Sequence, residues 1–244
     1  MDHTHANVNS PFAQRCVVKA EDVETCLRLW KYQEFMGKTR ELQGMDPEKL
    51  KGTIPRKIKT LMQHKEKDPL VMYERIIDET SKTWTASRQM PIHGGWHHFL
   101  VAGILVQALR NNGYDFTEED VKEVVERGLM LPGGGCGFHG VCGAGSGLGI
   151  ALSIVGRSTP IHKEQRSRAL MGSSEAYKRI SRLGGPRCCP LSTYTTLSLG
   201  VKALRDLGYD IQSSKVAGRC VFYDINDECH GEACPYHPRP DSDS

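Results

Sequence analysis

Cysteine is the residue type in this chain whose distribution most clearly suggests chemistry. Of the nine cysteines, seven fall after residue 135, and they form three groups. The odd total excludes complete disulfide pairing within one chain, and a chain of 244 residues can bury a core without covalent cross-links. The pattern therefore favours metal binding or redox chemistry. The three groups are Cys136 with Cys142, Cys188 with Cys189, and Cys220 with Cys229 and Cys234.

The first pair lies in the glycine-rich stretch GGGCGFHGVC, residues 133–142. Glycine tolerates positive φ, so two thiolates can approach one centre here without a backbone clash. Cys142 comes directly before a predicted helix that begins at Gly143. The free N–H groups at a helix start favour a bound anionic group, so Gly143 is a candidate cofactor-binding residue. We therefore predict one or two [4Fe–4S] clusters in this protein. The ligands of the first would be Cys136, Cys142 and one or both of Cys188 and Cys189.

The tail cysteines have a second interpretation. The segment 220–237 adds His230 and His237 to its three cysteines and has no helical or strand periodicity, so a metal is a plausible organiser. Zinc would use the three cysteines and one histidine, whereas the iron–sulfur interpretation makes them ligands of a second site or the remaining ligands of the first. Seven thiols exceed what one zinc site needs, which favours iron–sulfur.

Histidines supply the second set of candidate residues. His93, His97 and His98 lie in HGGWHHF, and His139 lies in the cysteine loop. Imidazoles at these positions would transfer protons or bind an anionic substrate; the alternative is a helix start with hydrogen-bonded histidines. Arg187, beside the cysteine pair, would bind a carboxylate or phosphate, or else is an ordinary surface arginine.

The elements that position these residues are predicted to be helices, so the fold class is mainly α: a helical domain with a Gly/Cys-rich loop and an irregular Cys-rich C-terminal segment. Three regions are expected: an N-terminal helical region (1–84), a helical core with the cysteine loop (85–212), and a metal-binding tail with a disordered end (213–244). Helical patterns cover residues 21–36, a segment from Pro47, 69–84, 96–112, 117–131, 143–155, 160–183 and 191–207.

Local signals sharpen three of these helices. Thr117 is placed to cap a helix whose first turn is acidic, and Gly113 is placed to end the preceding helix. Gly145, Gly147 and Gly149 would weaken an isolated helix, so they predict close approach to another backbone or a ligand. The stretch 55–69 is strongly basic and indicates either a solvated helix face or a docking surface for an acidic partner.

Composition narrows the class of protein. A net charge of +3 does not by itself indicate a nucleic-acid partner. The longest apolar run, residues 99–109, is shorter than the about 20 residues that a membrane span needs. The first residues are polar and lack a secretory signal, so a cytoplasmic location is expected. GAGSGLG follows no predicted strand, which argues against a dinucleotide site.

Residues 85–236, from HGGWHH through the cysteine loop and GGPRCC to the final CPY, resemble an uncharacterised cysteine-rich domain family of anaerobic bacteria and archaea. Members of that family stand alone or are joined to radical S-adenosylmethionine enzymes. The resemblance implies an anaerobic setting and iron–sulfur chemistry, and it supplies no catalytic residues. The cysteine loop is also similar in style to iron–sulfur serine dehydratases and cysteine desulfidases.

Three functions are therefore hypotheses for this chain. The first is an iron–sulfur protein of anaerobic metabolism, a lyase or sulfur-transfer enzyme whose cluster has an open iron for a small-molecule substrate. The second is a non-enzymatic accessory protein that delivers electrons, a cluster or a metal to a larger anaerobic enzyme and docks through residues 56–67. The third is a zinc-stapled interaction module.

Overall fold

A computed structural model describes residues 47–82, 92–215 and 218–239, with side chains from Pro55 onward. The chain divides into two compact units, Met1–Leu50 and Lys51–Ser244, and every described side chain belongs to the second unit. The described residues contain helices, turns and no strand, so the prediction of a mainly α fold is confirmed. The predicted helix over 21–36 lies outside the described residues. The predicted region boundaries near residues 84 and 212 both fall inside the second unit.

The first two described helices are α2, Pro47–Gln63, and α3, Pro69–Lys82. The helix start at Pro47 is as predicted, but α2 also continues through Pro55. The basic stretch is not uniformly solvated, because Lys57 and His64 are buried. The Lys57 ammonium donates to the Thr80 hydroxyl at 2.5 Å and lies over the Trp96 ring, and burial lowers its pKa to about 7.

Helix α4, His97–Asn111, forms the centre of the core, and almost all of its residues are buried. It ends as predicted, with Gly113 at positive φ. Helix α5, Glu118–Leu129, begins at Thr117, whose hydroxyl accepts from the Asp120 N–H while the Asp120 carboxylate accepts from the Thr117 N–H. The predicted N-cap is therefore confirmed as a capping box.

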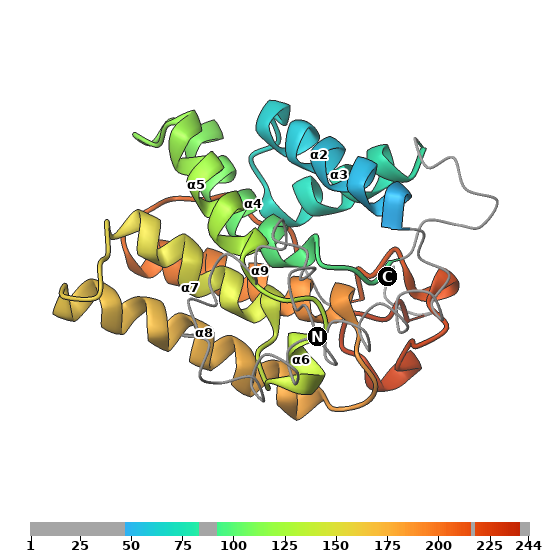
Figure 1. Cartoon of the computed structure of the whole chain (residues 1–244). Helices are drawn as coiled ribbons and strands as arrows, with labels where there is room; N and C mark the ends of the chain where they lie inside the picture. The colour runs from blue at the N-terminus through green and yellow to red at the C-terminus, as the bar shows by residue number, and fades with distance from the viewer. Residues whose placement is uncertain (1–46, 83–91, 216–217, 240–244) are drawn as a thin grey trace, which may run out of the picture. The chain divides into compact units, whose positions relative to one another are not determined.

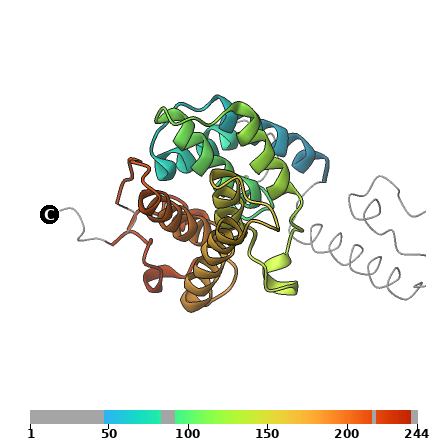
Figure 2. The same cartoon turned by 90° about the vertical axis from the view of Figure 1, so that its left-hand side faces the viewer.

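The cysteine loop contains one short helix, α6, Gly135–Phe138, and leads into α7, Gly143–Val155. Helix α8, Lys163–Leu183, packs along α7, and Figures 1 and 2 show the two side by side. The predicted close approach of the α7 glycines is confirmed: a Cβ on Gly149 would lie 2.8 Å from the Ala169 carbonyl of α8, and one on Gly147 would lie 2.8 Å from the Val101 Cβ of α4.

Helix α9, Cys189–Asp206, is followed by a tail whose described residues contain two short 3-10 helices, Tyr223–Ile225 and Gly231–Ala233, and no α-helix. Side chains anchor this tail to the helices. The Arg219 guanidinium pairs with the Glu74 carboxylate of α3 through two contacts of 2.7 Å, and the Tyr236 and Thr195 hydroxyls are 2.8 Å apart. Among the described helices, none combines the length and the apolar character that crossing a bilayer requires.

Candidate metal centre

Three helices start at the same place. The Cys189 N–H donates to His93 Nδ1 at 3.3 Å, and one turn further Thr193 bonds to His97, so α9 runs parallel to α4. Helix α7 also runs parallel to α4, because Gly143 faces the His98 ring and Gly147 faces Val101. The N-terminal ends of α4, α7 and α9 therefore meet, and each directs the positive end of its helix dipole toward this place.

Three cysteines lie at this meeting point, and we call them the junction group: Cys136, Cys142 and Cys189. Burial raises the pKa of the Cys189 thiol to about 12, and the Gly94 N–H opposes this rise by hydrogen bonding to it. Cys142 and Cys136 lie near enough to raise that pKa further. Cys142 is the N-cap residue of α7, and Cys136 is exposed on α6. Two segments far apart in sequence, the glycine-rich loop and the start of α9, thus bring their thiols to one end of the helix bundle.

The other four cysteines of the described chain form the tail group: Cys188, Cys220, Cys229 and Cys234. Together they line one enclosed cavity of about 10 Å³. Burial raises the pKa of the Cys188 thiol to about 11 and that of the Cys220 thiol to about 12, and their neighbours in the group raise both further. The adjacent residues Cys188 and Cys189 therefore belong to different groups.

All seven of these cysteines are free thiols. As the side chains are placed, no set of three or more His, Cys, Asp or Glu residues in the described ranges has the arrangement that holds a metal ion. Ligand-free thiols keep their protons and need not point to a common centre, because binding couples loss of those protons to closure of the site. The type and number of the donor atoms, together with the groups around them, therefore indicate which metal each set of cysteines would bind.

His93 connects the two groups. Its Nδ1 accepts the Cys189 N–H, so its Nε2 carries the proton and donates to Asn226 Oδ1 at 3.0 Å. The Asn226 amide in turn donates to the Cys188 sulfur at 3.5 Å. Burial lowers the pKa of His93, which keeps the ring neutral. A continuous set of hydrogen bonds thus runs from the junction group to the tail group.

The remaining candidate histidines differ in what their ring nitrogens do. His97 is buried with both nitrogens bonded, to Thr193 at 3.1 Å and to the Ile92 carbonyl at 2.9 Å, and burial lowers its pKa to about 3. His98 donates from Nδ1 to the Leu131 carbonyl at 3.3 Å, and its ring lies against Gly143. His139 is exposed at the end of α6. His98 is thus the histidine beside the junction group whose Nε2 has no hydrogen-bond partner among the described residues.

The two candidate cofactor-binding residues also occupy different places. Gly143 is the first residue of α7, where an added Cβ would come within 2.0 Å of the His98 ring. Only glycine therefore allows His98 to lie against the start of this helix. Arg187 is exposed and pairs with the Glu228 carboxylate at 3.3 Å.

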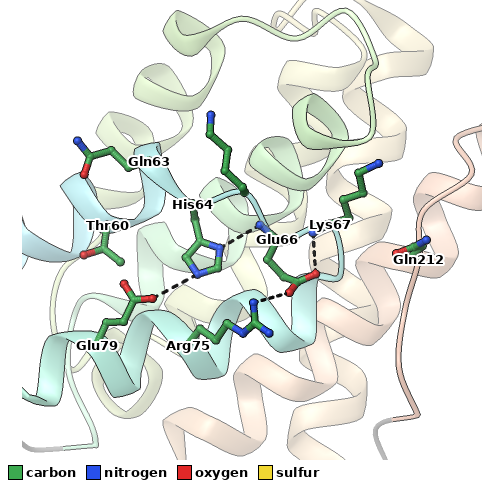
Figure 3. A pocket seen from close by; sticks show the side chains of 9 residues that line it. Thr60, Gln63, His64, Glu66, Lys67, Arg75, Glu79 and Gln212 are labelled. Atoms are coloured by element: carbon green, nitrogen blue, oxygen red, sulfur yellow. Dashed lines mark hydrogen bonds and ion pairs between the residues drawn. The ribbon is translucent and has the colours of Figure 1, made fainter.

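One polar cavity was not predicted from the sequence. It has a volume of about 570 Å³ and lies between α2, α3 and Gln212 (Figure 3). Figure 3 shows His64 between two acidic residues: its Nδ1 accepts the Glu66 N–H at 3.2 Å, and its Nε2 is 3.8 Å from Glu79. The basic stretch 55–69 is a signal for this region, but nothing in its spacing indicates a cavity. None of the cysteines lines it.

Comparison with known proteins gives a family without an assigned activity. Residues 58–237 match the model of a family described as a family of unknown function (DUF5714). No curated protein and no solved structure matches the chain. The matched residues include both thiol groups and the histidines between them.

Proposed function

The chain belongs to the family of unknown function DUF5714, and we propose that it is an iron–sulfur protein whose [4Fe–4S] cluster is bound by the junction group. The observation that carries this proposal is the meeting of three thiols with three helix N-termini. A cluster with thiolate ligands is anionic, and N–H groups and helix dipoles stabilise negative charge at such a position. The Gly94 N–H, which already bonds to the Cys189 sulfur, is a donor of the kind that tunes cluster potentials.

The junction group offers three thiolates, so one iron of a four-iron cluster would lack a cysteine ligand. Such an iron, when bound, supplies a Lewis acid for a small-molecule substrate. His98 is the residue we assign to proton transfer, at Nε2, because its Nδ1 is held by Leu131 and burial lowers its pKa. A lyase or sulfur-transfer reaction fits these roles. We place the protein in the cytoplasm of an anaerobe, where an exposed cluster escapes oxidation, and we retain the proposed link to radical S-adenosylmethionine enzymes.

Iron and sulfide analysis tests this proposal. After anaerobic reconstitution, the protein should contain iron and acid-labile sulfide in equal amounts, and each of Cys136→Ser, Cys142→Ser and Cys189→Ser should lose most of both. Cys26→Ser is the control and should keep its iron, because Cys26 is one of the two cysteines before residue 136 and is outside the proposed ligand set. A reconstituted wild-type protein without iron and sulfide would contradict the proposal, and a Cys189→Ser variant with a full cluster would contradict the ligand assignment.

A second function is favoured by exposed apolar side chains within seven residues of Cys136 in the sequence. Leu129, Met130 and Phe138 are 43%, 49% and 49% exposed, and apolar side chains of this kind are what a partner protein would cover. An accessory protein would dock there to deliver electrons, a cluster or a metal to a larger enzyme. The two functions differ spectroscopically: small thiols or carboxylates should change the electron paramagnetic resonance signal of a cluster with an open iron, and should leave a fully cysteine-bound cluster unchanged.

A further inference from the structure

We infer that the tail group is a separate site that binds a single zinc ion through Cys188, Cys220, Cys229 and Cys234. This inference concerns different cysteines from the proposed function and does not depend on it. Its first support is that all four thiols line one cavity, although they come from the start of α9 and from three positions in the tail. A cavity of about 10 Å³ is close to the space of one small sphere, which suits one ion and not a four-iron cluster.

The second support is the backbone around each thiol. Each of the four sulfurs accepts an N–H from a residue two or three positions further along the chain. The donors are Leu191 for Cys188 and Gly231 for Cys229, both at 3.4 Å, with Phe222 for Cys220 and Tyr236 and His237 for Cys234. Turns of this kind direct N–H groups at sulfur and stabilise thiolates bound to a metal. A chance gathering of buried thiols does not require the same turn at every one.

The third support is that the donor set is complete without a histidine. Four cysteines satisfy the closed tetrahedral arrangement of structural zinc sites. His230 and His237 also line the cavity, and each donates from one ring nitrogen to a backbone carbonyl: His230 Nε2 to Pro186 at 2.8 Å, and His237 Nδ1 to Pro238 at 2.9 Å. We assign the fourth ligand to Cys188, and not to the histidine that the sequence suggested, because its sulfur lines the cavity with the other three and accepts an N–H as they do.

A bound ion would stabilise the tail, which buries few side chains. Between residues 221 and 236, only Phe222, Cys234 and Tyr236 are buried, so this segment has little apolar core of its own. Its backbone does bring the ligands together, because the Cys220 N–H donates to the Tyr236 carbonyl at 2.7 Å and the Cys229 N–H donates to the Asn226 carbonyl. Zinc would replace the thiol protons, draw the four sulfurs inward and join both ends of the tail to α9.

Metal analysis of paired variants tests the inference. The full-length protein is purified with Zn²⁺ in the medium, and zinc and iron are measured separately by mass spectrometry. Cys188→Ser and Cys229→Ser should each lose one equivalent of zinc per chain, whereas Cys189→Ser, the matched neighbour, should keep it. His230→Ala and His237→Ala should also keep it. With Co²⁺ in place of zinc, the wild-type protein should show the intense visible bands of a tetrahedral tetrathiolate site.

Three outcomes would overturn the inference: unchanged zinc in both Cys188→Ser and Cys229→Ser, loss of zinc in Cys189→Ser to the same extent as in Cys188→Ser, or a Co²⁺ spectrum without sulfur-to-metal charge-transfer bands. Cys229 belongs to no helix. If Cys188→Ser loses zinc only because it disturbs the start of α9, Cys229→Ser still tests the site independently. A protein that lacks iron but retains this zinc pattern would reject the proposed iron–sulfur function and leave the zinc site standing.

Discussion

Replacing Gly128 with alanine should destabilise the protein by about 2 kcal/mol or more. Gly128 is buried in α5 where that helix crosses α4. A Cβ there would lie 2.5 Å from the Phe99 Cα and 2.7 Å from the His98 carbonyl oxygen. Both are backbone atoms, so no side-chain rotation relieves the overlap, and the two helices must separate. Urea denaturation followed by circular dichroism measures the effect.

The sign of this result is informative, because alanine normally stabilises a helix relative to glycine by up to about 1 kcal/mol. Gly137→Ala is the matched control: Gly137 is exposed in α6, its φ is not positive, and no atom lies within 4 Å of an added Cβ. It should change stability by no more than about 0.5 kcal/mol. A Gly128→Ala variant as stable as wild type would mean that α4 and α5 do not approach as described. Because Phe99 and His98 belong to the start of α4, the variant should also weaken metal binding at the junction group.

Acidification from pH 6.5 to 5 should destabilise the wild-type protein by about 1.5 kcal/mol more than a His97→Gln variant. Burial lowers the pKa of His97 to about 3, against the opposing hydrogen bond to Ile92. The folded-state pKa is thus below that of the unfolded chain, which binds the proton first as pH falls. Stability that is complete above pH 6.5 is therefore lost progressively toward pH 3.

The measurement is the difference between two urea-unfolding series, so titrations common to both proteins cancel. Glutamine does not titrate, and it retains a donor and an acceptor for Thr193 and Ile92. His162→Gln is the control, because His162 is exposed and its variant should keep the wild-type dependence on pH. Parallel curves for wild type and His97→Gln would show that the ring at position 97 is not held neutral by burial, and would return it to the candidates for acid–base chemistry.

Much of the helical fold could be predicted because its signals are local. Thr117 and the acids after it determine where α5 begins, and the glycines of α7 indicate close packing before any partner is known. Other features depend on tertiary contacts. The continuation of α2 through Pro55 and the burial of Lys57 beneath Trp96 run against local preferences, since proline disfavours a helix interior and lysine is rarely buried.

The sequence supplies the residue types of the candidate site as a prediction, and the structure adds how the cysteines are grouped. The sequence predicts that the cysteines bind a metal, yet their spacing cannot group Cys189 with the glycine loop and Cys188 with the tail. That division results from the parallel packing of α4, α7 and α9, which is a property of the core. Likewise, the separate roles of His97 and His98 depend on which side of α4 faces Thr193 and which faces Gly143.

The position of Cys188 and Cys189 at the first turn of α9 limits how this protein can change in length. Inserting one residue immediately after Cys189 would rotate the rest of the helix by about 100° relative to both thiols, and so would separate Thr193 from His97. The connection after α9 has no such restriction, because residues 208–219 form no helix where the structure describes them. Natural variation in chain length among relatives should therefore concentrate in that connection, while the two cysteines and the turn after them keep a fixed register.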